Sequence, residues 1–270
     1  MKIKDLCALA ADVPDGASIC FGGSFLQRVP LAFVRELVRR GTKDLEVIKP
    51  SPGYDLDILC RTSSVRSVRA GIVLLEGGYG FAPWYRKAVE EGLVELEEHA
   101  CMTLVAGLRA AAYGVPFQPV AGVEGSDLIE LNGWAQLVDP YGSNRAVTVI
   151  PAIKPDIAVV HAQEVDELGN ARVFGTSHWD RIMSRAAKRV LLTAERLVPT
   201  EEFRARPELT LIPGFMVEAV AIVPHGAWPG SVFGEYDIDA GGVDSYLAPG
   251  EEELRRHLAS APEARSSIYA

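Results

Sequence analysis

The chain has 270 residues, of which 48% are hydrophobic and 23% are charged, which suits one large domain or two small ones with an ample core. Its net charge of −9 argues against general nucleic-acid binding, and no apolar run approaches the ~20 residues that span a bilayer. We therefore expect neither nucleic acid nor a membrane among its partners. Four widely spaced cysteines without a CxxC pair, and an N-terminus without a long apolar run, predict a cytoplasmic protein with reduced thiols and no signal peptide.

Short β-branched runs alternate with amphipathic helices in the first 113 residues. A buried strand is expected at 17–21, followed by two glycines and a helix from Pro30 to Arg40. Proline suits the first turn of a helix, and Gly41 suits the residue that follows the last turn. We expect further strands at 45–48, 67–75 and 93–96, and further helices at 55–61, 83–91 and 102–113.

The second half of the chain begins with a turn-rich stretch at 121–144 and then returns to strands. We expect a helix at 180–188 and strands at 146–150, 156–162, 172–174, 189–194 and 217–223. This alternation predicts an α/β fold, with a mostly parallel sheet flanked by helices on both faces. We interpret residues 1–270 as a single domain in which 224–270 form a C-terminal appendage.

Ligands of such sheets bind at the carboxyl ends of the strands, which selects the loops 22–29, 76–82, 97–101 and 163–171. In the first of these, Gly22 and Gly23 allow a ligand to approach the backbone, and the helix from Pro30 contributes unpaired N–H groups. Such amides could stabilise an anion or a carbonyl oxygen that gains charge. The alternative is a tight turn packed in the core.

Several common site motifs are missing from the sequence. It contains no GxGxxG, GxxxxGK[ST] or GxSxG motif, and its five histidines show neither HxH nor HExxH spacing. His178 and Asp180 are better explained by solvated or capping roles than by a metal pair. We expect no metal site.

The stretch "DGASICFGGSFLQRVP" resembles the signature of the α subunits of family I coenzyme A-transferases. It departs from that signature at Cys20, at Ser24 where Phe is usual, and at Arg28 where Gly is usual. Five later stretches are similar to motifs of the α subunits of the glutaconate CoA-transferase branch and follow in the same order: "GLRAAAYGVPFQPV", "GSDL", "DELGNA", "LTAERLV" and "PHGAWPGSVFGEYDID". The positions that fit the first signature are Asp15, Gly16, Ile19, Phe21, Gly22, Gly23 and Pro30.

This resemblance implies the CoA-transferase fold and half of a heteromeric enzyme, in an α2β2 assembly. In the family a glutamate of the β subunit, in a Ser-Glu-Asn-Gly context, attacks the acyl-CoA thioester. This chain lacks that motif, so the resemblance implies an α subunit that is inactive or weakly active without its partner. The substrates would be an acyl-CoA and a small (di)carboxylic acid. Coenzyme A would be a substrate, with no permanently bound cofactor.

The resemblance also indicates which residues line the site. Gln27 and Arg28 could reach a substrate carboxylate, although a solvated Arg28 is the simpler interpretation. Ser24 could donate a hydrogen bond to substrate or cap the following helix. Glu76 precedes two glycines and is expected in a lining loop rather than as the nucleophile. The predicted substrate- and CoA-binding residues are Gly22, Gly23, Ser24, Phe25, Gln27, Arg28, Glu76 and Gly77.

Catalytic candidates within this chain come from "ELEEHACMTL" at 95–104. Glu98 and His99 could form an acid–base pair in a dry pocket, or Glu98 could be a solvated acid at a helix start. Cys101 could be a nucleophile or an inert thiol. Relatives that decarboxylate acyl-CoAs or hydrolyse C–C bonds make those reactions the alternative to CoA transfer. A non-catalytic scaffold protein is a third possibility.

Overall fold

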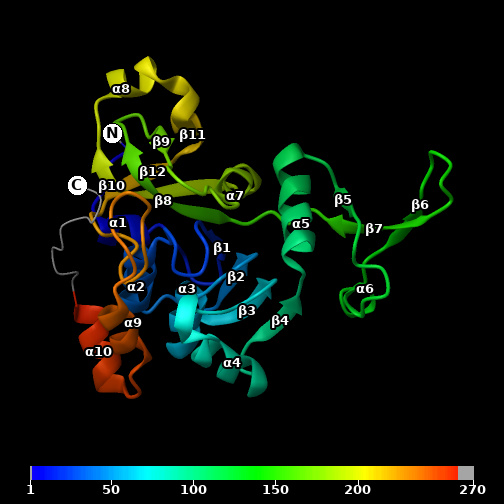
Figure 1. Ribbon diagram of the computed structural model, residues 1–270, viewed down its shortest axis with the longest axis horizontal. Coiled ribbons are helices and arrows are strands. Elements are labelled where there is room, and N and C mark those ends of the chain that lie inside the picture. The colour runs from blue at the N-terminus through cyan, green and yellow to red at the C-terminus, as the bar shows by residue number, and fades with distance from the viewer. Residues whose placement is uncertain (1, 261–270) are drawn as a thin grey trace.

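The computed structural model describes residues 2–260 and contains a nine-stranded, mostly parallel sheet (Figure 1). At its centre, β1 (Ser18–Phe21) pairs in parallel with β2 (Leu45–Lys49) and β8 (Ile157–Val165). Beyond β2 follow, also in parallel, β3 (Val65–Ala70) and β4 (Glu95–Glu98). Beyond β8 follow, also in parallel, β10 (Arg189–Leu197) and β12 (Ala219–Ile222). An antiparallel extension is formed by β9 (Ala171–Arg172) and β11 (Thr210–Ile212).

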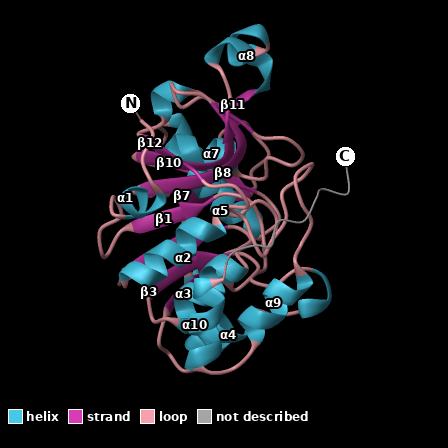
Figure 2. Cartoon of the chain, turned by 90° about the vertical axis from the view of Figure 1, so that its left-hand side faces the viewer, coloured by secondary structure: helices cyan, strands magenta, loops and turns pink. Residues whose placement is uncertain are grey.

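Helices cover both faces of this sheet, because successive strand residues point to opposite sides. Ile19 and Phe21 face one hydrophobic layer, whereas Cys20 between them faces the other. Figure 2 shows the first layer from its helical side. That layer contains residues of α1 (Leu6–Ala10), α2 (Leu31–Arg40), α3 (Tyr54–Arg61), α4 (Pro83–Glu90), α9 (Ala240–Leu247) and α10 (Glu251–Ala259). The opposite layer contains residues of α5 (Cys101–Tyr113) and α7 (Asp180–Ala186).

The remaining helical segments are short. They are α8 (Thr200–Ala205) and the 3-10 turns Gly77–Tyr79, Pro207–Leu209 and Gly214–Met216. Among the helices of residues 2–260, none combines the length and the apolar character needed to cross a bilayer. The α/β fold with a mostly parallel sheet and flanking helices, expected from the sequence, is confirmed.

A second, three-stranded antiparallel sheet projects from the body beyond α5 (Figure 1). Its strands are β5 (Phe117–Val120), β7 (Ala146–Pro151) and β6 (Gln136–Val138), and α6 (Leu128–Leu131) lies between β5 and β6 in the chain. The turn-rich interpretation of 121–144 therefore missed a helix and a strand. All three residues of β6 are exposed, so the sequence carries no apolar alternation there.

Two other strand predictions need correction. The strand expected at 67–75 ends at Ala70, because the chain turns away at Gly71. A Cβ atom on Gly71 would lie 2.7 Å from Cys101 N, so this glycine lets the end of β3 approach the start of α5. The strand expected at 93–96 forms two residues later, as β4.

The C-terminal helices are attached to α3 through buried aromatic and polar side chains. Tyr54 Oη lies 2.5 Å from His257 Nε2, and the Tyr246 hydroxyl donates to Asp57 Oδ2. Burial raises the pKa of Asp57 to about 6, although hydrogen bonds from Tyr246 and Tyr85 oppose this rise. Residues 240–259 thus pack on the body, and a separate appendage from 224 onward stays a prediction.

One ion pair lies fully buried beneath the carboxyl edge of the sheet. Lys49, the last residue of β2, places Nζ 2.6 Å from Asp55 Oδ2 in α3, and both side chains are 0% exposed. Lys49 Nζ also donates to Gly22 O at 3.2 Å, and Asp55 Oδ1 accepts from Gly53 N–H at 2.8 Å. The pair therefore joins the loops that follow β1 and β2.

We expect Asp55→Ala to lower the free energy of unfolding by about 3–5 kcal/mol, because it leaves the Lys49 ammonium buried without a counter-charge. Urea denaturation of the purified protein measures this loss. Glu90→Ala, which breaks the exposed Arg86–Glu90 pair, is the control and should leave stability nearly unchanged. Equal losses in the two variants would contradict this account of the buried pair.

Candidate functional site

Asp180, the first residue of α7, fixes loop 22–29 at the carboxyl end of β1. Its side chain is fully buried, Oδ1 accepts from Gly23 N–H at 2.9 Å, and Oδ2 lies 2.6 Å from Arg28 Nη1. The Arg28 guanidinium also donates to the carbonyl oxygens of His161 (2.7 Å) and Thr176 (3.1 Å). Because Arg28 is only 3% exposed, it is not the solvated side chain that the simpler interpretation proposed.

The backbone amides of this loop are used inside the chain. Gly22 N–H donates to Val159 O at 2.8 Å, Gly23 N–H to Asp180, and Ser24 N–H to Gln27 O at 3.0 Å. Our expectation that Gly22 and Gly23 present free N–H groups to a ligand is therefore wrong. What the glycines permit is close packing, since a Cβ on Gly23, which has φ of 69°, would lie 2.3 Å from Gln27 O.

Side chains of loop 22–29 connect it to the loops after β2 and β3. Ser24 Oγ lies 2.8 Å from Ser51 Oγ, and Phe25 N–H donates to Ser51 O at 3.1 Å. Gln27 Nε2 donates to Glu76 Oε1 at 2.7 Å, immediately before the turn that begins at Gly77. The structure thus brings together the predicted binding residues of both loops.

The predicted acid–base pair has a different composition. His99 Nε2 lies 3.0 Å from Glu97 Oε1, and His99 Nδ1 lies 3.1 Å from Thr103 Oγ1. Glu98 is exposed, and its carbonyl oxygen accepts from Asn132 Nδ2. The hydrogen bond from His99 lowers the pKa of Glu97. The His99 side chain itself is 0% exposed, so it fixes the turn between β4 and α5.

Cys101 begins α5 and is half-buried at the carboxyl edge of the sheet. Its Sγ donates to Pro50 O at 3.3 Å. Burial raises the pKa of the Cys101 thiol, which disfavours the thiolate that a nucleophile requires. Across residues 2–260, no group of three or more His, Cys, Asp or Glu side chains is arranged to hold a metal ion.

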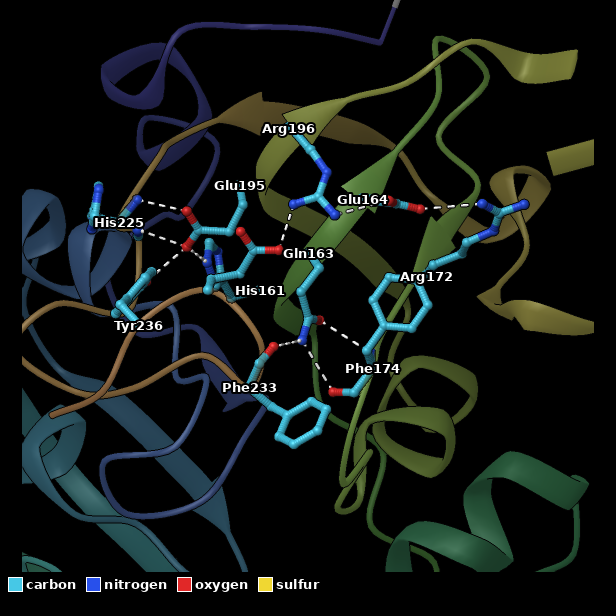
Figure 3. A network of polar contacts seen from close by, with 12 residues as sticks. His161, Gln163, Glu164, Arg172, Phe174, Glu195, Arg196, His225, Phe233 and Tyr236 are labelled. Carbon is cyan, nitrogen blue, oxygen red and sulfur yellow. Dashed lines mark hydrogen bonds and ion pairs between the residues drawn. The ribbon is translucent and has the colours of Figure 1, made fainter. Parts of the chain in front are cut away.

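A buried network around Glu195, at the ends of β8 and β10, was not found from the sequence (Figure 3). Glu195 Oε1 lies 2.7 Å from His161 Nε2 and accepts from the Tyr236 hydroxyl at 2.7 Å. Its other oxygen accepts from His225 N–H at 2.7 Å. Burial raises the pKa of Glu195, but the hydrogen bonds from His161 and Tyr236 outweigh it, so the pKa is lowered overall. His161 therefore packs rather than facing a cleft.

The comparison with protein families matches residues 4–222 to the coenzyme A transferase family. This chain belongs to the coenzyme A transferase family. The match spans the whole parallel sheet, from α1 to β12. It therefore includes loop 22–29, the ion pairs that hold it and the β4–α5 turn.

Three curated relatives share about a third of their aligned residues with this chain. An uncharacterized protein of Archaeoglobus fulgidus is 34% identical over 89% of this chain, which spans only 54% of that protein. The A-type subunit of glutaconate CoA-transferase from Acidaminococcus fermentans is 31% identical over 88% of this chain and 79% of its own. The cholesterol ring-cleaving hydrolase IpdA subunit of Mycobacterium tuberculosis is 31% identical over 93% of this chain and 85% of its own.

Two solved structures are similar over nearly the whole chain. Glutaconate coenzyme A-transferase from Acidaminococcus fermentans superimposes with a TM-score of 0.89 and 28% identity, covering 95% of this chain and 87% of that one. A variant of the decarboxylase AibA/AibB superimposes with a TM-score of 0.87 and 30% identity, covering 96% of this chain and 98% of that one. Family members with different reactions thus share this fold.

We expect Gly23→Ala to destabilise the protein by more than about 3 kcal/mol, because the new methyl group meets the backbone of Gln27 and Arg28 at a left-handed φ. Gly16→Ala is a matched control, since Gly16 has φ of 77° but open space around the added methyl group. The control should lose only about 1–2 kcal/mol. Urea denaturation of both variants measures the difference, and similar losses would contradict the close packing described for Gly23.

His178 provides a pH test of the same region. Burial, followed by repulsion from Arg28, lowers the pKa of His178 to about 4. The unfolded chain, in which a histidine titrates near pH 6.5, therefore binds more protons between about pH 6.5 and 4 than the folded chain. Stability contributed by neutral His178 is lost as pH falls through this window. We expect His178→Asn to reduce the pH dependence of the urea midpoint there; an unchanged slope would refute it.

Proposed function

We propose that this chain is the α subunit of a two-subunit CoA-transferase that exchanges coenzyme A between an acyl-CoA and a small (di)carboxylic acid. The observation that carries this proposal is the family match together with a fold that aligns with a glutaconate CoA-transferase over 95% of the chain. Two curated relatives are named as one of the two kinds of subunit in CoA-transferases, which supports a β-type partner in an α2β2 assembly.

The chemistry requires a nucleophile that this chain does not supply in the family context. A glutamate carboxylate of the partner would attack the thioester carbon, so that an acyl–oxygen bond forms and the carbon–sulfur bond breaks. The released CoA thiolate would then attack the glutamyl carbonyl of this anhydride. The products are an enzyme-bound glutamyl-CoA and the free acid, and the second acid reverses both steps.

In this proposal, the present chain shapes and orients the acyl-CoA site. Loop 22–29 is fixed by Asp180 on one side and by Lys49 on the other, so it is rigid before substrate arrives. Gln27 and Glu76 lie at the carboxyl edge, where they would line the thioester site. The other lining residues of this proposal are Gly22, Gly23, Ser24, Phe25, Arg28 and Gly77.

The alternative is a protein that supports decarboxylation or C–C hydrolysis of an acyl-CoA. It is favoured by the likeness to the decarboxylase AibA/AibB and to the IpdA hydrolase. Glu97, Glu98, His99 and Cys101 are the residues of this chain that such a reaction would draw on. The raised pKa of Cys101 and the buried position of His99 make CoA transfer the better-supported function.

Four unpaired cysteines at Cys7, Cys20, Cys60 and Cys101 support our placement of the protein in the reducing cytoplasm. Coenzyme A enters this proposal as a substrate that leaves again, and not as a resident cofactor.

The test is to purify the chain with and without the β-type protein that co-purifies with it. We expect kcat/KM for CoA transfer to be at least about a thousandfold lower for the chain alone, as expected when a nucleophile is absent. Borohydride or hydroxylamine added with acyl-CoA should mark a glutamate of the partner. Robust transfer by the chain alone, or a mark on Glu76 or Glu98, would overturn the assignment of this chain as the α half. Decarboxylation or hydrolysis without transfer would establish the alternative.

A further inference from the structure

A cavity of about 200 Å³ opens beside loop 22–29, between that loop and residues 231–237, with residues 174–178 as a third wall. Phe174, Phe233 and Tyr236 supply aromatic rings to its lining. Pockets for drug-sized ligands have about 300–1,000 Å³, so this cavity suits only a short group.

Two buried polar side chains hold the aromatic walls in place (Figure 3). Gln163 is 0% exposed; its Nε2 donates to Phe174 O at 3.0 Å and to Phe233 O at 3.1 Å, and its Oε1 accepts from Phe174 N–H at 3.2 Å. The Tyr236 hydroxyl donates to Glu195 and accepts from Ala227 N–H at 3.0 Å. The cavity is therefore pre-formed, which reduces the entropy lost when a ligand binds.

The charges around the cavity do not favour an anion. Arg28 reaches the lining, but its guanidinium is paired at 2.6 Å with the buried carboxylate of Asp180. His178 is neutral at pH 7, because burial and the nearby Arg28 lower its pKa to about 4. Asp237 adds an exposed carboxylate to the lining. A ligand carboxylate would lose its hydration here without meeting an uncompensated positive charge.

The cavity is continuous with the candidate acyl-CoA site through one residue. Gln27 belongs to the cavity lining, and its side-chain amide donates to Glu76 in the loop after β3. A short group that extends from a thioester beside loop 22–29 would pass Gln27 and enter between Phe174 and Phe233.

We propose that this cavity receives the uncharged end of the acyl group, so that the preferred acids are short monocarboxylic acids with an alkyl or aromatic end rather than dicarboxylic acids. The inference rests on the proposed function, because it places the thioester beside loop 22–29. It narrows the acid class on the chemistry of the lining, in which aromatic rings and uncharged polar groups predominate.

The experiment compares two CoA thioesters of equal carbon number on the co-purified complex, with acetate as acceptor. Butyryl-CoA ends in a methyl group and succinyl-CoA in a carboxylate. We expect kcat/KM to be at least about tenfold higher for butyryl-CoA, because a carboxylate pays a desolvation cost in this cavity. Equal values, or a preference for succinyl-CoA, would overturn the inference while leaving CoA transfer itself intact.

Phe233→Arg places a positive charge at the mouth of the cavity, where the Phe233 side chain is 71% exposed and is not needed for folding. We expect this variant to shift the ratio of kcat/KM values at least about tenfold toward succinyl-CoA. Phe215→Arg is the matched control, since Phe215 is 87% exposed and lies outside the cavity lining. An equal shift in both variants would show that general surface charge, and not the cavity, controls the preference, which rejects the inference.

If the complex transfers CoA from neither thioester, the proposed function fails, and calorimetric titration of the same complex then tests the cavity separately. Tighter binding of butyryl-CoA than of succinyl-CoA, with the difference reduced in Phe233→Arg alone, supports the cavity assignment. Equal or tighter binding of succinyl-CoA rejects it.

Discussion

The buried carboxylate of Asp180 is the contact on which the candidate site depends. One oxygen accepts the Gly23 N–H and the other pairs with Arg28, so a single side chain fixes both halves of loop 22–29. Because Asp180 begins α7, and α7 packs against α5, the loop is tied to the helical layer on one face of the sheet. Lys49, from β2, ties the same loop to the sheet itself.

The same ion pair decides the electrostatics of the neighbouring cavity. Had Arg28 been free, as the sequence suggested, the wall would have offered a cation to a carboxylate substrate. Its pairing with Asp180 removes that charge and leaves shape and aromatic contact to select the ligand. A residue that looks like an anion-binding group in the sequence thus becomes a structural one through a contact 152 residues away, from position 28 to position 180.

Local signals carried most of the fold prediction. The strands at β1, β2, β8, β10 and β12 lie in apolar runs, and α2 begins after Pro30 and ends before Gly41, so periodicity and capping sufficed. The projecting sheet was missed because exposed β6 has no apolar alternation. In the site, the Gly22–Gly23 turn was recognisable, but the uses of its amides and of Arg28 were not. Those depend on Asp180 and Val159, partners that only the tertiary fold brings near.

Arg28 adopts a left-handed backbone conformation with φ of 51°, in which glycine would be less strained. A change from Arg to Gly here would relieve the backbone, yet it would strand the Asp180 carboxylate without its counter-charge, at a cost of about 3–5 kcal/mol. Neither position can therefore drift alone. Descendants of this sequence should keep Arg28 and Asp180 together or lose them together, so the two columns should covary among its close relatives.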